Sequence, residues 1–117
     1  MRNLRILLSG CLLALSCCTT LEPLPDTDLI AIGDVRDTEF LESLPFDPND
    51  LLGHGWFEAT MTIERVKQGV RPPQNPVTIR YVAHNQRVEG RWEVRLRKSD
   101  EGFYFVCARG GAGYICD

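Results

Sequence analysis

The sequence predicts a small all-β protein, a barrel or sandwich built from five or six short strands. With 117 residues the chain has room for one small domain. Apolar and polar residues alternate with a period of two in several segments, as expected for half-buried strands. Clusters of Pro, Gly, Asn and Asp separate these segments and indicate turns between strands. Together these observations favour an all-β fold.

Six segments carry the strand pattern. The cleanest is 56–66, in which Phe57, Ala59, Met61 and Ile63 share one face and polar residues share the other. A Pro-rich break at 71–76 must be loop or sheet edge, because Pro has no N–H for a ladder. The predicted strands are, in order, 29–33, 56–66, 77–83, 91–98 (with Trp92, Val94 and Leu96 on one face), 103–108 and 114–116.

The region from Arg36 to Gly55 has no sustained hydrophobic period and is rich in acidic residues, Pro and Gly. We interpret it as a long excursion with one helical turn after Asp37. Long loops in compact domains are often functional. The alternative, which we favour, is a lid that covers one end of a barrel.

The N-terminus resembles an export and lipidation signal. Arg2 and Arg5 form a short basic region, and a short apolar stretch follows that is too short to span a bilayer. Residues Leu13 to Cys17 then resemble a bacterial lipobox, in which the Cys thiol receives a diacylglycerol. We therefore expect residues 1–16 to be a lipoprotein signal peptide and Cys17 to be lipidated.

Two other cysteines compete for this role. Cys11 has the better local motif, but it follows too short an apolar core, and Cys18 would need Cys17 immediately before the cleavage site. A plain secretory signal or an uncleaved anchor remains the alternative. After lipidation, residues 17–27 would form a tether and residues 28–117 the folded domain. The lipid would anchor the protein at the bacterial cell envelope, and we expect it to face the periplasm. Because Cys18 is not Asp, the outer membrane is favoured over the inner.

Cys107 and Cys116 flank a Gly-rich segment that is typical of a hairpin turn. If the turn centres on Gly111 and Ala112, the two cysteines lie opposite each other, at a separation that suits a cross-strand disulfide. An oxidising, exported compartment is consistent with such a bond. A redox pair is less favoured, because catalytic dithiols are usually closer in sequence.

No catalytic or metal-binding motif is recognisable. His54 and His84 are interpreted as separate histidines on surface loops, because neither has a nucleophile motif nearby. Asp47 and Asp50 belong to an oxygen-rich stretch that resembles a turn more than a calcium site. We expect no enzymatic activity, no cofactor and no metal.

Arg91, Arg95 and Arg97 share one face of a predicted strand. Cross-strand ion pairs with Glu58 and Glu64 are the favoured interpretation. The functional alternative is a basic stripe that binds an anionic partner. A formal net charge of −3 excludes nucleic acid as an expected ligand, because phosphate contacts need clustered Lys and Arg.

The later part of the chain resembles a family of secreted domains. The segment from Ala59 to Gly69, with Arg65-Val66-Lys67 near its end, and the strands 77–81, 92–98 and 102–106 carry the resemblance. These segments are similar to the oligonucleotide/oligosaccharide-binding (OB) barrel of tissue inhibitors of metalloproteinases and netrin C-terminal modules. The resemblance covers about residues 28 to 116 and implies an OB-like barrel. It implies no inhibitory residue, because the N-terminal Cys amine that grips zinc in the animal inhibitors would be acylated here.

We therefore expect a non-enzymatic envelope lipoprotein whose β domain binds a small ligand, a polysaccharide or an envelope protein. The residues expected to contribute to binding are Asp47, Asp50, Arg95 and Arg97. The alternative is an inhibitor of an envelope-active hydrolase, a lysozyme or a protease, which would present the acidic 37–50 segment to its target.

Overall fold

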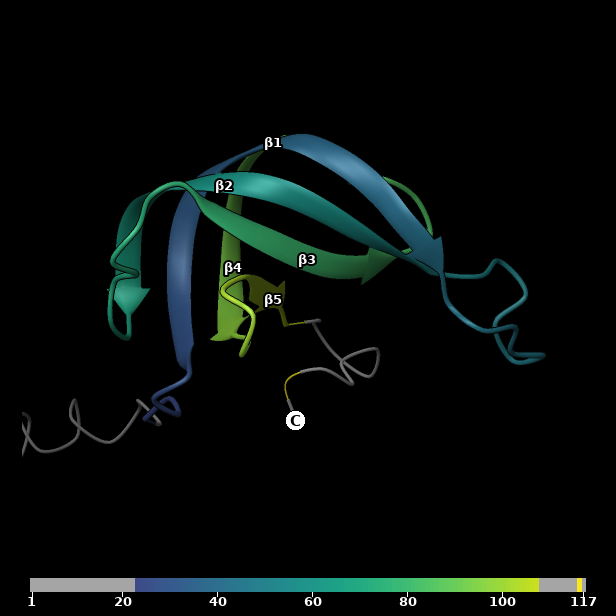
Figure 1. Cartoon of the computed structure of the whole chain (residues 1–117), viewed down its shortest axis with the longest axis horizontal. Coiled ribbons are helices and arrows are strands. Elements are labelled where there is room, and N and C mark those ends of the chain that lie inside the picture. The colour runs from purple at the N-terminus through teal and green to yellow at the C-terminus, as the bar shows by residue number, and fades with distance from the viewer. Residues whose placement is uncertain (1–22, 108–115, 117) are drawn as a thin grey trace, which may run out of the picture.

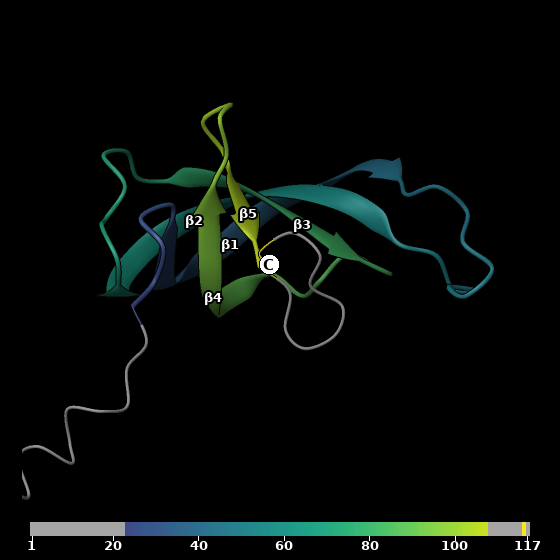
Figure 2. The ribbon, with the colours of Figure 1, turned by 90° about the horizontal axis from the view of Figure 1, so that it is seen from below.

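A computed structural model describes residues 23–107 and residue 116 of the chain. Five strands form one closed barrel in the order β1-β2-β3-β5-β4 (Figures 1 and 2). The strands are β1 (Asp28–Ser43), β2 (Gly55–Gln68), β3 (Val77–Ala83), β4 (Gly90–Lys98) and β5 (Tyr104–Val106). The described residues contain no helix. The predicted all-β barrel is confirmed. The expected wholly antiparallel sheet is corrected, because β3 and β5 run parallel and the sheet is therefore mixed.

Alternate residues of the strands fill the barrel. Phe57, Ala59, Met61 and Ile63 of β2 point inward, as their alternation predicts, and Tyr81, Ile79 and Leu96 pack against them. The polar positions between them face outward, because successive side chains on a strand point to opposite faces. Burial of this single apolar cluster is the main force that closes so small a barrel.

Gly33 lies at a point where β1 pairs closely with a neighbouring strand on each side. Around this residue β1 pairs with β2 on one side and with β4 on the other, so that Gly33 lies opposite both Ile63 and Trp92. A Cβ atom at position 33 would lie 2.3 Å from the backbone oxygen of Thr62. The close approach of the two backbones therefore requires a residue without a side chain.

The prediction of a long excursion from Arg36 to Gly55 is wrong for residues 36–43 and for Gly55, which belong to strands. Residues up to Ser43 continue β1, residues from Gly55 begin β2, and the two strands pair throughout. Asp37 has a φ of 56° and lies where the register shifts, which is a β-bulge rather than a helical turn. The bulge interrupts the period of two, so the sequence pattern hid the strand. The remaining loop, 44–54, projects beyond the barrel and does not cover its end (Figure 1).

The C-terminal prediction is confirmed in part. The predicted strand 103–108 is the shorter β5, which closes the barrel between β3 and β4. Cys107 and Cys116 form a disulfide with their Cα atoms 5.3 Å apart. The hairpin expected between them, with most of the predicted strand 114–116, lies outside the described residues. The predicted signal peptide, Cys17 and much of the tether also lie outside them.

No helix in the described part of the chain is long and apolar enough to cross a membrane.

Candidate functional site

The loop between β1 and β2, residues 44–54, is the most prominent feature outside the barrel. Its base is closed by a hydrogen bond from the Leu44 N–H to the His54 carbonyl, 2.9 Å long. At its tip the Asp47 carboxylate accepts a hydrogen bond from the Asn49 N–H, and the Asp47 carbonyl accepts one from the Asp50 N–H. These short-range bonds are those of an Asx turn, so the loop has a defined shape of its own.

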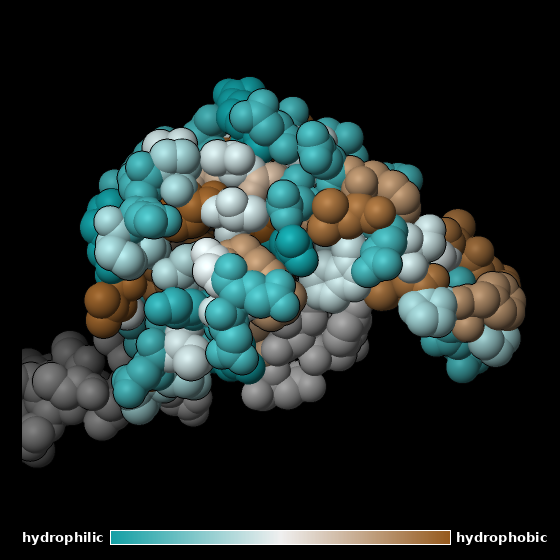
Figure 3. Space-filling view, viewed as in Figure 1, coloured by the Kyte–Doolittle hydropathy of each residue, from teal (hydrophilic) through white to brown (hydrophobic). Residues whose placement is uncertain are grey.

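Apolar side chains cover the outside of this loop. Phe46, Leu51 and Leu52 are 85%, 87% and 83% exposed, and Phe40 at the end of β1 is also exposed. Figure 3 shows hydrophobic residues gathered at the end of the molecule where this loop projects. We call Phe46, Leu51 and Leu52 the apolar tip. Single exposed apolar residues are ordinary, but a cluster on a projecting loop marks an interaction site.

An open pocket of about 320 Å³ lies against the loop, and the residues of the apolar tip form part of its lining. Its walls combine apolar side chains with the only two histidines of the chain and two carboxylates. The polar residues that converge there are Asp47, Asp50, His54 and His84. A pocket in which polar groups converge is a candidate ligand site.

His54 and His84 meet in this pocket because of the strand register. Gly55 at the start of β2 lies opposite Ala83 at the end of β3. His54 and His84 are the next residues outward on each strand, so the register brings their rings together, with centroids 3.7 Å apart. Both histidines lie on loops, as the sequence predicts, but nothing in the sequence pattern indicates that they meet. Only the β2–β3 register, which the sequence pattern does not give, would have placed them together.

Both rings are held by partners from the loop. The Nδ1 atom of His54 is in close contact with the carboxylate of Asp50, which lies four residues earlier in the same loop. The Nδ1 atom of His84 lies 2.6 Å from the Gly53 carbonyl. Asp50, His54 and His84 each offer a donor atom within 4.8 Å of the other two, which makes them a candidate ligand set for a metal ion.

The two predicted acidic binding residues are thus both in the pocket wall, but both are engaged within the loop. Asp47 accepts the bond that forms the turn, and Asp50 contacts His54. Their charges organise the loop before any partner arrives. The two carboxylates therefore contribute to the shape of the loop. The apolar tip, which the sequence pattern did not single out, is the most exposed apolar part of the loop.

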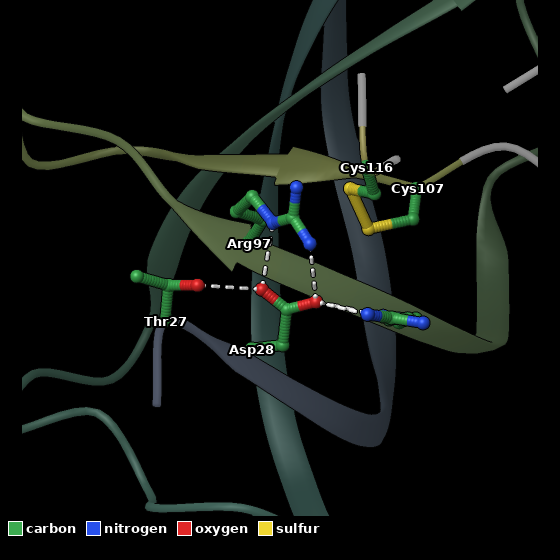
Figure 4. Close-up of a disulfide and its surroundings, with 6 residues drawn as sticks. Thr27, Asp28, Arg97, Cys107 and Cys116 are labelled. Atoms are coloured by element: carbon green, nitrogen blue, oxygen red, sulfur yellow. Dashed lines mark hydrogen bonds and ion pairs between the residues drawn. A yellow bond between two sulfur atoms is a disulfide. The ribbon is translucent and has the colours of Figure 1, made fainter. Parts of the chain in front are cut away.

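The two predicted basic binding residues lie elsewhere and contact a buried carboxylate. Asp28 is 3% exposed and lies directly opposite Arg97 in the β1–β4 register. Arg97 donates from Nε and Nη2 to the two Asp28 oxygens, at 2.8 and 3.0 Å, and Arg95 donates from Nε at 2.8 Å. Figure 4 shows this group in the surroundings of the disulfide.

The electrostatics of Asp28 follow from these contacts. Burial alone would raise the pKa of its carboxyl, but the hydrogen bonds from Arg97, Arg95 and Thr27 outweigh it and lower the pKa from 3.8 to about 2. Asp28 is therefore ionised at neutral pH, and its single negative charge is shared by the two guanidinium groups. Arg95 and Arg97 thus bind a residue of the barrel itself, which argues against their serving as a basic stripe for a ligand.

The other charged residues of the outer face pair across strands. Arg91 reaches Glu64 across β1 at 3.3 Å, and Arg80 donates to Glu58 at 2.9 Å between β3 and β2. Lys67 pairs with Glu93 at 2.9 Å. These are the cross-strand contacts that the alternation of charged residues favours, although Glu58 takes Arg80 as its partner.

No protein-family model matches this chain, and no curated protein or solved structure shows significant similarity to it. Function must therefore be inferred from the geometry described above.

Proposed function

We propose that this protein is a lipid-anchored protein of the bacterial cell envelope that binds a partner protein through the apolar tip of its β1–β2 loop. The observation that carries the proposal is the exposure of Phe46, Leu51 and Leu52 together on one projecting loop. Large apolar side chains that fill pockets on a partner supply most of the binding free energy at protein interfaces.

The shape of the loop supports binding over a merely structural role. The Asp47 turn, the Asp50–His54 contact and the Leu44–His54 bond hold the loop before a partner arrives. A preordered loop loses less conformational entropy on binding, so more of the contact energy appears as affinity. Asp47 and Asp50 serve this order rather than the contact.

The position of the loop favours a protein over the anchoring membrane as its partner. The first described residues, which precede β1, and the 44–54 loop lie at opposite ends of the long axis (Figure 1). A chain tethered through lipid on Cys17 would therefore present the apolar tip away from its own membrane. The lipobox-like segment Leu13–Cys17 is the basis for this anchor and for a periplasm-facing location.

A second candidate is inhibition of an envelope-active hydrolase, a lysozyme or a protease. A narrow loop of fixed shape suits insertion into an active-site cleft, and the resemblance to the barrel of metalloproteinase inhibitors agrees with this idea. The apolar tip, not Asp47 and Asp50, would enter the cleft. That analogy is at the level of the fold, so it stays second to general partner binding.

Site-specific photo-crosslinking in bacterial cells tests the proposal. A photoreactive residue at Leu52 should give one discrete crosslinked protein, and Phe46→Ser with Leu51→Ser should reduce its yield by about tenfold or more. Val70, which is 82% exposed on the β2–β3 loop, provides the control position. Equal crosslinking from Val70, or a yield that the double variant does not change, would contradict the proposal. Crosslinks to phospholipid would instead assign the loop to a bilayer.

Two further measurements separate the parts of the proposal. The intact mass of the protein from a bacterial membrane fraction should correspond to a chain that begins at Cys17 and carries acyl groups. A chain that retains Met1 would remove the anchor while leaving the partner to be tested. Titration of a purified lysozyme or metalloprotease with the protein tests the second candidate. An inhibitor should abolish the activity of the hydrolase at a 1:1 ratio, whereas a general partner-binding protein should leave it unchanged.

A further inference from the structure

We propose that Asp50, His54 and His84 form a binding site for a divalent transition-metal ion, and that Zn²⁺ fits this donor set best. The three side chains come from two loops and converge in one pocket, with donor atoms within 4.8 Å of one another. The proposal concerns the isolated chain and does not depend on the partner of the apolar tip.

The chemistry of the three donor atoms favours zinc. Two imidazole nitrogens and one carboxylate oxygen are typical of zinc sites with three protein ligands, in which a fourth position stays open for water or another group. Imidazole ligands suit zinc, copper and nickel, whereas magnesium and calcium prefer sites made of oxygen alone. The pocket is open to solvent on one side, so an ion can reach the three donors directly.

The hydrogen bonding of His84 is compatible with a ligand role. A carbonyl oxygen only accepts hydrogen bonds, so the contact of Nδ1 with the Gly53 carbonyl is a hydrogen bond that Nδ1–H donates. In the uncharged form of the ring the lone pair then lies on Nε2, where it can bind an ion. Histidines that bind zinc usually donate their other ring N–H in this way, which fixes both the tautomer and the ring orientation.

Asp50 and His54 supply the other two ligand atoms. Their close contact brings a ring nitrogen and a carboxylate oxygen to one place in the loop. Zn²⁺ would take the place of this contact and bind a ring nitrogen of His54 and a carboxylate oxygen of Asp50.

The spacing requires only a small rearrangement. In a tetrahedral zinc site two ligand atoms are about 3.3–3.5 Å apart, so donors at the outer separation must close in by on the order of 1.5 Å. His84 is exposed and the loop lies at the surface, so side-chain rotation can supply this movement. The two imidazole rings are tilted by 35° and their centroids lie 3.7 Å apart, so both are already at the same place. The bound ion would link the 44–54 loop to the end of β3.

Calorimetric titration of the purified, chelator-treated full chain with Zn²⁺ tests the proposal, with its free thiols alkylated so that cysteines do not bind the ion. One equivalent of Zn²⁺ should bind, and Co²⁺ in its place should give the visible absorption of a four-coordinate site. His54→Asn and His84→Asn should each weaken Zn²⁺ binding by roughly 100-fold. Asp100→Asn, which removes an exposed carboxylate from the turn between β4 and β5, should bind as the wild type does.

Absence of Zn²⁺ binding, or binding that survives His54→Asn together with His84→Asn, would overturn the proposal. A second measurement covers variants that fail to fold: NMR of the wild-type chain should show both imidazoles perturbed by one equivalent of Zn²⁺, and an unchanged histidine spectrum would equally overturn it. The Phe46→Ser and Leu51→Ser variant should still bind Zn²⁺, so this result separates the metal site from the partner-binding role.

Discussion

Asn75 holds the backbone of Ile63 through both ends of its carboxamide. Its Oδ1 atom accepts a hydrogen bond from the Ile63 N–H at 2.8 Å, and its Nδ2 donates to the Ile63 carbonyl at 2.9 Å. The β2–β3 ladder ends at Met61 and Val77, and Pro76 has no N–H to extend it. The side chain of Asn75 therefore takes the place of the missing strand residue.

Removal of this side chain should destabilise the barrel. Asn75→Ala leaves the Ile63 N–H and carbonyl without these partners, so we expect the free energy of unfolding to fall by about 1–3 kcal/mol. Chemical denaturation measures the change. Gln74→Ala in the same exposed loop should stay within about 0.5 kcal/mol of the wild type. Equal losses from both variants would show that the carboxamide does not replace a strand.

Asp28 should make stability depend on acid pH. Its folded pKa of about 2 lies below the ordinary value of 3.8. A lowered pKa contributes stability that is complete above about pH 4 and is lost as the pH falls towards 2. The shift corresponds to about 2 kcal/mol. Asp28→Asn should therefore be less stable than the wild type at pH 7, and the difference should narrow below pH 4.

Denaturation curves of the two proteins from pH 7 to pH 2 measure this effect. Asp26→Asn removes an exposed carboxylate two residues earlier and should follow the wild-type curve. If the Asp28→Asn and wild-type curves stay parallel down to pH 2, the Arg95 and Arg97 contacts do not hold the pKa of Asp28 low.

The glycines at 33 and 55 should differ in their tolerance of a methyl group. A Cβ at Gly33 meets the Thr62 backbone, which is fixed in the ladder, whereas one at Gly55 meets the Phe40 ring at 2.6 Å, which can turn away. We expect Gly33→Ala to lower the free energy of unfolding by about 3 kcal/mol and Gly55→Ala by about 1 kcal/mol. Thermal or chemical unfolding ranks the two, and a larger loss at Gly55 would contradict this account.

The disulfide should stabilise the folded protein by restricting the conformations of the unfolded chain. Closing a loop of this length restricts the unfolded state, so loss of the Cys107–Cys116 bond should cost about 2–3 kcal/mol. Cys107→Ser combined with Cys116→Ser, and reduction of the wild type, should shift the denaturation midpoint by the same amount. A midpoint that a reductant leaves unchanged would mean that the bond is absent or adds nothing.

Much of the barrel was predictable because the strand pattern is local. The alternation around Phe57, Ala59 and Met61 fixed β2 to within a few residues, and β3 matched its predicted bounds. β1 was underestimated because the bulge at Asp37 breaks the alternation while the ladder continues on both sides of it. The parallel pairing of β3 with β5 was not predicted, because a period of two does not specify strand direction.

The site was less predictable because it depends on register and on exposure. Asp47 and Asp50 were selected as acidic loop residues, and they do lie in the pocket wall. The convergence of His54 with His84 follows from the pairing of Gly55 with Ala83, a long-range fact that neither local sequence carries. Likewise, the sequence alone gives Arg95 and Arg97 the pattern of a basic stripe. Only the β1–β4 register, which places Asp28 opposite Arg97, shows that the two arginines contact a carboxylate of the barrel.

The double pairing of β1 makes closure of the barrel depend on distant parts of the chain. β1 pairs with β2, its neighbour in sequence, on one side, whereas its pairing with β4 joins residues as far apart as Asp28 and Arg97. Contacts of the second kind form slowly. An intermediate in which only β1, β2 and β3 were paired would expose one edge of β1 and one edge of β3, and such edges readily pair with another chain. We therefore expect conditions that delay closure to favour aggregation.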